Sequence, residues 1–231
     1  MAALAHELST LVAGLCKHAE LLAAAAAMDA LGQPVTTDEA VREMLKRAAD
    51  LVRGASALGA QGNQTALGVL SRAILENLIV LLWVQVAEEN VATLKKAALV
   101  ELARAAKINF EKGKARIINR QTGEDATAEF LQSDRFKSRG KRASVESRAK
   151  EAGVEDLYTV FYRFMSLDMH GLGPARKGED QDSIAIIHMQ GIGALATASG
   201  HAGVRWLVHR QRTDNETLRA LLGIGRPSPN E

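Results

Sequence analysis

Proline is scarce in this chain, and this constrains the fold more than any other feature of the sequence. Only four prolines occur among 231 residues, and two of them lie in the C-terminal tail. Runs of β-branched residues are few, and much of the apolar content is alanine and leucine. Such a sequence favours long helices over sheets. The fold class that we expect is therefore all-α.

Apolar periodicity and helix stop signals place the expected helices along the chain. They cover residues 2–31, about 36–57, about 64–89, about 90–112, 154–169, about 182–212 and 216–222. The second should begin with a capping box in which Thr36 is the N-cap and Glu39 lies three residues on. The third is apolar around most of its surface and should lie at the centre of the bundle. We expect one antiparallel helical domain over residues 1–224, followed by a disordered tail at 225–231.

A basic segment interrupts this pattern. Residues 104–150 carry 13 basic and 6 acidic side chains, and glycines punctuate residues 113–150, which we expect to form a partly irregular insertion. Its densest positive patch consists of Arg135, Lys137, Arg139, Lys141 and Arg142. One interpretation is a nucleic-acid-binding surface, whose lysines and arginines would contact phosphates. The other is a solvated, flexible insertion, which is the usual meaning of a charge run.

The other composition signals point to a cytoplasmic protein without a cofactor. The single cysteine, Cys16, excludes an internal disulfide and fits a reducing compartment, and no signal peptide is visible. Residues Ile184–Val204 contain no Asp, Glu, Lys or Arg, but small and polar residues dilute their apolarity, so a buried helix is favoured over a membrane span. The three histidines on the last long helix lack the spacing of a helical zinc pair, so we expect no metal.

The most informative motif is Tyr162–His170. In an α-helix Arg163 and His170 lie about 20° apart around the axis, with Ser166 between them. Tyr162, Ser166 and His170 would form a row at spacings of four. A histidine can exchange a proton near neutral pH, and an arginine can neutralise charge on phosphate oxygens. The pair is therefore a candidate catalytic pair for a phosphodiester, with a neighbouring ribose hydroxyl as nucleophile and no metal ion.

A second helix carries charges that need partners. Arg72 and Glu76 lie one turn apart in an otherwise apolar segment, and buried charges must be paired. In the functional interpretation they position Arg163 and His170, together with Tyr162 and Ser166. In the structural interpretation the same residues form a buried polar network that fixes the packing of two helices.

These two motifs carry a resemblance. The pairing of Arg-x-x-x-Glu at residues 72–76 with Tyr-x-x-x-Ser-x-x-x-His at residues 162–170 resembles an uncharacterised bacterial helical family, a domain of unknown function. Arg163 and His170 are also similar to the Arg-x(4–6)-His motif of the HEPN superfamily (higher eukaryotes and prokaryotes nucleotide-binding domains). That resemblance implies an all-helical bundle that acts as a dimer, often as a metal-independent ribonuclease in toxin–antitoxin or phage-defence systems. One position departs from the pattern, since Phe164 stands where catalytic members commonly have a polar residue.

The function that we expect from the sequence is HEPN-like RNA binding or metal-independent RNA cleavage by a homodimer, with RNA as the partner and a further protein as regulator. The alternative is a non-catalytic helical protein-interaction module, in which the same Arg, Glu, Tyr and His residues are a structural network.

Overall fold

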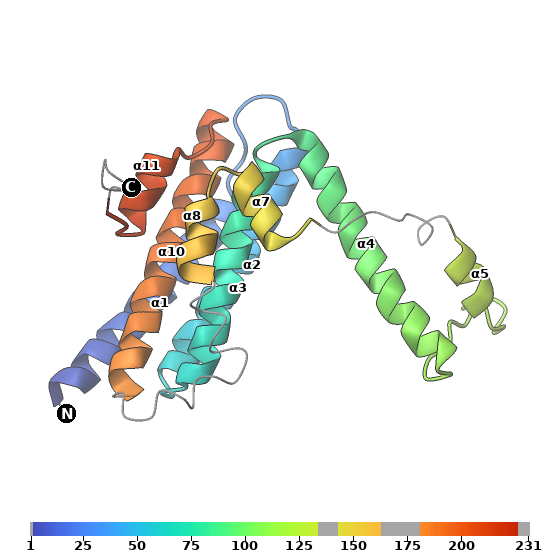
Figure 1. Ribbon diagram of the computed structural model, residues 1–231, viewed down its shortest axis with the longest axis horizontal. Helices are drawn as coiled ribbons and strands as arrows, with labels where there is room; N and C mark the ends of the chain where they lie inside the picture. Colours follow the sequence, from blue (N-terminus) through green and yellow to red (C-terminus); the bar gives the residue numbers. More distant parts are fainter. Residues whose placement is uncertain (1, 134–142, 163–180, 226–231) are drawn as a thin grey trace. The chain divides into compact units, whose positions relative to one another are not determined.

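The computed structural model describes residues 2–133, 143–162 and 181–225, and these are helical throughout most of their length (Figure 1). The helices are α1 (Ala2–Ala26), α2 (Thr36–Gly59), α3 (Gln64–Val84), α4 (Glu88–Glu111), α5 (Thr127–Gln132), α7 (Val145–Glu151), α8 (Glu155–Leu157), α10 (Gln181–His209) and α11 (Asn215–Leu221), with a π-helical turn η1 (Tyr158–Tyr162). The described residues form no strand, only one isolated bridge between Ile118 and Asp125. The all-α prediction is confirmed.

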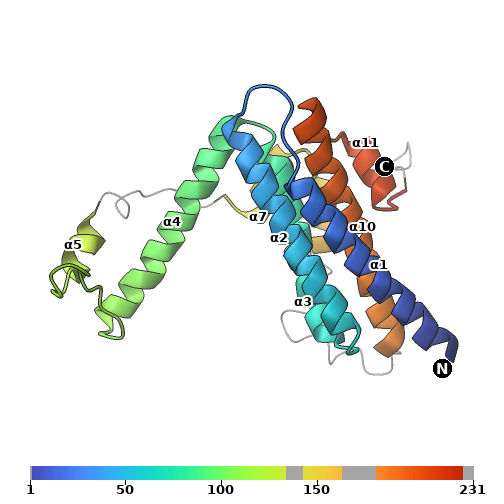
Figure 2. The same cartoon turned by 180° about the vertical axis from the view of Figure 1, so that it is seen from behind.

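The chain divides into two compact units, one made of residues 1–88 and 144–231 and the other of residues 89–143. In the first, α1, α2, α3 and α10 pack as a bundle in which α2 contacts the other three (Figures 1 and 2). Helix α2 runs antiparallel to each of them, as both views show. The shorter helix α7 packs on α3, and α11 packs on α10.

The core of the bundle lies where the sequence pattern predicts it. On α3 the side chains of Ile74, Leu78 and Leu81 are fully buried, so the third helix is central. The predicted apolar stripe of α2, which is Val41, Leu45, Ala48 and Val52, is also fully buried. Helix α10 approaches α2 closely at Gly203, where a Cβ atom would stand 2.6 Å from both methyl carbons of Leu45. A glycine is therefore required at this crossing.

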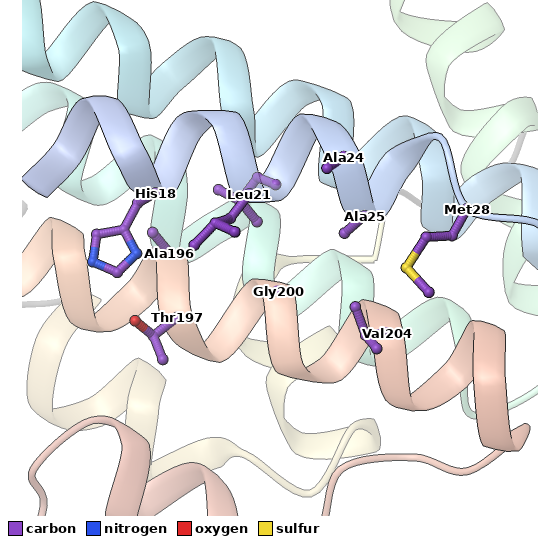
Figure 3. Close-up of a pocket in the computed structure, with 10 residues that line it drawn as sticks. His18, Leu21, Ala24, Ala25, Met28, Ala196, Thr197, Gly200 and Val204 are labelled. Carbon is purple, nitrogen blue, oxygen red and sulfur yellow. The ribbon is translucent and has the colours of Figure 1, made fainter.

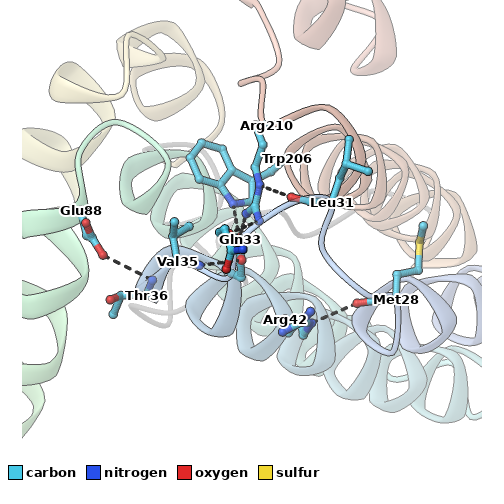
Figure 4. Close-up of polar contacts among 10 residues, drawn as sticks. Met28, Leu31, Gln33, Val35, Thr36, Arg42, Glu88, Trp206 and Arg210 are labelled. Carbon is cyan, nitrogen blue, oxygen red and sulfur yellow. Dashed lines mark hydrogen bonds and ion pairs between the residues drawn. The ribbon is translucent and has the colours of Figure 1, made fainter.

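The predicted capping box at Thr36 is wrong by one residue. Val35 is the N-cap of α2, and its side chain makes no capping hydrogen bond. Its backbone N–H donates instead to Oδ2 of Asp38, at 3.0 Å. Tertiary contacts set the residue at which α2 begins. Asp38 is buried, and its other carboxylate oxygen, Oδ1, accepts hydrogen bonds from Trp206 and Arg210 at the end of α10 (Figure 4).

Two helices end earlier than their patterns indicate, for a related reason. Helix α1 ends at Ala26 rather than near residue 31, because the Leu31 N–H donates to the Leu207 carbonyl of α10 at 2.7 Å. Helix α10 ends at His209, and Arg210 takes the left-handed conformation with φ of 53°. Its Nε donates to the Leu31 carbonyl at 2.8 Å, so side-chain contacts offset the unfavourable backbone geometry.

The second unit contains most of α4 and the segment expected to be irregular. After α4, Ile117 donates to the Thr127 hydroxyl at 2.9 Å, which closes the loop onto the start of α5. The predicted single domain of residues 1–224 covers both units. The basic patch Arg135, Lys137, Arg139, Lys141 and Arg142 lies outside the described residues, as does the predicted disordered tail beyond residue 225.

Two described helices are long and apolar enough to cross a membrane by length and composition alone, and Ile184–Val204 is not one of them. They are the segments 6–26 and 64–84. The most apolar window of the second is 67% buried inside the bundle, as expected of a core helix, whereas that of the first is only 22% buried. Helix α1 therefore exposes an apolar surface.

Candidate functional site

Arg72, Glu76 and Tyr162 come together where η1 packs on α3. The Arg72 Nε donates to Oε1 of Glu76 at 3.1 Å, and a terminal guanidinium nitrogen of Arg72 donates to the Tyr162 hydroxyl. The guanidinium carbon also lies 4.3 Å from the centre of the Tyr162 ring, within the range of a cation–π contact. Three of the six residues predicted for the catalytic site are thus in mutual contact.

A π-helical turn places Tyr162 at this position. Leu157 at the end of α8 is buried and anchors the chain before residues 158–162 widen into η1. The ring of Tyr158 stacks on that of Tyr162, with centroids 4.7 Å apart and planes 22° from parallel. Single π-helical turns often mark functional sites, because they change which side chains face a neighbour.

The π-helical turn corrects one expectation. We predicted a continuous α-helix over residues 154–169, but residues 155–157 form one short helical turn and residues 158–162 a π-helix. The 100° rotation per residue therefore does not apply to the turn that carries Tyr162. Arg163, Ser166 and His170 lie outside the described residues.

Burial and the neighbouring side chains shift the pKa values of Tyr162 and Arg72. Burial raises the pKa of Tyr162, and the adjacent Glu76 carboxylate raises it further, while Arg72 opposes both effects. Burial works against the charge on Arg72, but Tyr162 and Glu76 outweigh it and raise its pKa. Both raised pKa values keep Arg72 protonated and the phenol of Tyr162 neutral at neutral pH.

The cluster remains partly open to solvent. The Arg72 side chain is 16% exposed and that of Glu76 37% exposed. An arginine held in a fixed orientation by a carboxylate and an aromatic ring can present its remaining N–H groups to an oxyanion. This arrangement can bind and orient a phosphate or another anion.

Sequence reasoning missed the role of Tyr158. A signal was available, because Tyr158 and Tyr162 are the only two tyrosines in the chain and lie four residues apart. It also missed the support on α7, where the Trp83 indole N–H donates to Glu151 at 2.8 Å and Arg148 lies 5.0 Å above the Trp83 ring. These contacts fix α7 on α3, and α7 in turn contacts η1.

Among the described residues, no group of three or more His, Cys, Asp and Glu side chains is arranged to hold a metal ion. The described part of the candidate site accordingly offers one carboxylate, that of Glu76, beside a guanidinium group.

Comparison with known proteins gives a family but no activity. Neither the curated proteins nor the solved structures include a significant match to this chain. The sequence of residues 38–176 matches a family described as a family of unknown function, DUF5677. The matched region covers more than half of the chain and contains Arg72, Glu76 and Tyr162 as well as residues 163–170. On this evidence the chain belongs to the DUF5677 family of unknown function.

Proposed function

We propose that this protein is a HEPN-like RNA-binding protein that cleaves RNA without a metal ion, as a cytoplasmic homodimer in a bacterial toxin or phage-defence system. Arg163 and His170 are the proposed catalytic residues. Arg72, Glu76, Tyr162 and Ser166 are positioning residues, and the basic patch of residues 135–142 binds the RNA backbone.

The observation that carries the proposal is the contact of Tyr162 with Arg72 and Glu76. Tyr162 directly precedes Arg163, one of the two proposed catalytic residues, in the sequence. The raised pKa of Tyr162 keeps its phenol protonated and able to donate a hydrogen bond. A guanidinium and a phenol held together on α3 and η1 form a site suited to a phosphate group.

The reaction would follow from the chemistry of a phosphodiester beside a ribose hydroxyl. A base removes the proton of the 2′-hydroxyl, its oxygen attacks the adjacent phosphorus, and the bond to the 5′-oxygen breaks. The products are a 2′,3′-cyclic phosphate and a 5′-hydroxyl, and the departing oxygen takes up a proton. His170 suits the proton transfers because its ordinary pKa lies near neutrality. Arg163 suits the developing negative charge on the phosphate oxygens.

The alternative function is a non-catalytic protein-interaction module. One observation favours it: Arg72 already has a carboxylate, a hydroxyl and an aromatic ring as partners, as in a polar network that only fixes helix packing. In that case the cluster would contribute to stability and make no contact with RNA.

Incubation with total RNA separates the two proposals. The wild-type protein is expected to cleave RNA equally well with and without a chelator, leaving 2′,3′-cyclic phosphate ends. His170→Ala is expected to abolish cleavage, and His6→Ala, a change of an exposed histidine on α1, serves as the matched control. Cleavage that survives His170→Ala removes the mechanism. A wild-type protein that neither cleaves RNA nor retards it in a gel favours the interaction module.

A further inference from the structure

The exposed apolar surface of α1 forms one wall of a cavity that shares no lining residue with the Arg72 cluster. The cavity has a volume of about 450 Å³ and lies between α1 and α10 (Figure 3). Leu21 and Leu22 line it from α1, Met28 lines it from the segment that follows α1, and Ala196 and Val204 line it from α10. Its size and apolar lining are typical of small-molecule sites.

A second cavity of about 380 Å³ continues from the first, since both are lined by Gly200 and Val204. Its other lining residues are His201, Arg205 and His209, which follow one another at spacings of four along α10. Side chains at this spacing lie on one face of a helix. The second cavity therefore carries nitrogen donors next to an apolar groove.

The nitrogen donors are incompletely used. Within the described part of the chain, Nε2 of His201 and Nε of Arg205 are buried and have no hydrogen-bond partner. A terminal nitrogen of Arg205 donates to the Gln211 side chain at 3.3 Å and, besides hydrogen bonds from Thr217, the charge of Arg205 helps to lower the pKa of Asp214. No acidic side chain lines either cavity. Within the cavity itself, a negatively charged acceptor would complete the hydrogen bonding of this row.

We propose that the two cavities together bind a long-chain monocarboxylate, with the alkyl chain between α1 and α10 and the carboxylate at Arg205. The apolar cavity matches an alkyl chain because it removes that chain from water, and Arg205 matches a carboxylate because its N–H groups can donate to both oxygens. A single ligand of this class fills the apolar cavity with its alkyl chain and places its carboxylate in the second cavity. A small polar anion would instead leave the apolar wall of α1 exposed to water. The site is independent of the proposed RNA chemistry.

The test is calorimetric titration of the full-length protein with sodium dodecanoate below its micelle concentration. The protein is expected to bind dodecanoate and to bind neither acetate, which lacks the chain, nor dodecyltrimethylammonium, which carries the opposite charge. Equal binding of the cationic and anionic amphiphiles would overturn the proposal. So would binding to anionic phospholipid vesicles with no binding of monomeric dodecanoate, which would identify α1 as a membrane contact.

Matched variants locate the site. Arg205→Gln is expected to weaken dodecanoate binding about tenfold, the loss of one charge-assisted contact, while Arg53→Gln on α2 leaves it unchanged. Gly200→Leu fills the groove and is expected to abolish binding, whereas Gly191→Leu on the same helix faces open space and should not alter it. Unchanged affinity in both Arg205→Gln and Gly200→Leu would refute the site.

A milder variant covers the case in which Gly200→Leu does not fold. In Gly200→Ala the added Cβ meets only the Leu22 methyl, at an ordinary contact distance of 3.6 Å. The bundle should tolerate this change, and the narrower groove should bind dodecanoate more weakly than the wild type. Unchanged affinity in Gly200→Ala, together with unchanged affinity in Arg205→Gln, would overturn the proposal.

Discussion

Two clusters in the bundle unit share the same ingredients, an arginine, a carboxylate and an aromatic side chain, yet they differ in what surrounds them. In the first, Asp38 is 2% exposed and accepts from Arg210, Trp206 and the Val35 backbone. In the second, Arg72 and Glu76 keep 16% and 37% of their side chains exposed and meet Tyr162. The first joins the α1–α2 loop to the end of α10, and the second joins α3 to η1.

The difference lies in what is left for a ligand. Arg210 donates to Asp38 and to the backbone carbonyls of Leu31 and Gln33, so its guanidinium is occupied by the fold itself (Figure 4). Arg72 donates to two side chains, and its side chain is 16% exposed, compared with 26% for Arg210. The second cluster is the more open one at its carboxylate, because Glu76 is 37% exposed and Asp38 only 3%. The cluster of Asp38 and Arg210 therefore serves stability, and the cluster of Arg72 and Glu76, whose carboxylate is the more open of the two, can take part in chemistry.

The largest effect on stability is expected from Asp38→Ala. The change leaves the Arg210 charge and the Trp206 N–H without their acceptor, and breaking a buried pair of this kind costs about 3–5 kcal/mol. Chemical denaturation measures the loss in the free energy of unfolding. A loss below about 1 kcal/mol is typical of exposed ion pairs. Such a result would contradict the comparison, because the first cluster would then contribute no more to the free energy of unfolding than an exposed pair does.

A smaller loss of stability is expected from Arg72→Met, together with a larger loss of activity. Methionine keeps an unbranched apolar stem but removes two half-buried hydrogen bonds, which costs about 1–3 kcal/mol of unfolding free energy. RNA cleavage, measured where both proteins are fully folded, should fall at least tenfold in kcat. If the Arg72→Met protein has the wild-type kcat, the second cluster has no role in catalysis and is, like the first, a purely structural network.

Tyr162→Phe sharpens the comparison through its pH dependence. At neutral pH the loss of the hydroxyl should cost about 0.5–1.5 kcal/mol of unfolding free energy. The folded-state pKa of Tyr162 is raised above its ordinary value of 10.0. Its contribution is therefore fully present below pH 10 and falls as the pH rises toward the folded-state pKa, because the unfolded chain releases this proton first.

Chemical denaturation of the wild type and Tyr162→Phe between pH 8 and pH 11 measures the contribution of the Tyr162 hydroxyl to the free energy of unfolding. The difference between their unfolding free energies should shrink above about pH 10. Tyr158→Phe is the matched control, since it leaves the Arg72 and Glu76 contacts in place. A difference that stays constant over this range would show that the pKa of Tyr162 is not raised in the folded protein.

The smallest loss of unfolding free energy is expected from Asp50→Ala. This variant gives the value for an exposed ion pair, against which the losses in the other variants can be compared. Asp50 pairs with Arg53 at 2.7 Å on the surface of α2, where the two side chains are 64% and 57% exposed. Such a pair contributes about 0–1 kcal/mol, and less at high salt. A loss as large as that of Asp38→Ala would mean that burial does not separate the clusters.

The sequence predicted the parts of this molecule that depend on local periodicity. The stripe from Val41 to Val52 and the burial of α3 follow from helix geometry, and the meeting of Arg72, Glu76 and Tyr162 follows from the need of buried charges for partners. The cap of α2 and the end of α10 were not predictable in this way. Both depend on the contact of Asp38 with Arg210, which lies 172 residues away in the chain.

The π-helical turn at Tyr158–Tyr162 escaped the sequence for a similar reason. The pattern of residues 154–169 suits an α-helix, and the wider turn is defined by the packing of η1 on α3 and α7. The groove between α1 and α10 was missed because most of its lining residues are small or aliphatic, and such residues carry no sequence signal of a binding site. Only the structure separates the buried face of α1 from the exposed one.

The central claim is that the Arg72–Glu76–Tyr162 cluster belongs to a catalytic site, and the cleavage rate of a single-stranded RNA by the His170→Ala protein tests it most directly. The rate is expected to fall at least about 100-fold, as for the loss of a general acid–base residue, while the melting temperature stays within a few degrees of the wild type. An unchanged rate would contradict the claim, and so would a collapse of the melting temperature in a protein whose wild type cleaves no RNA.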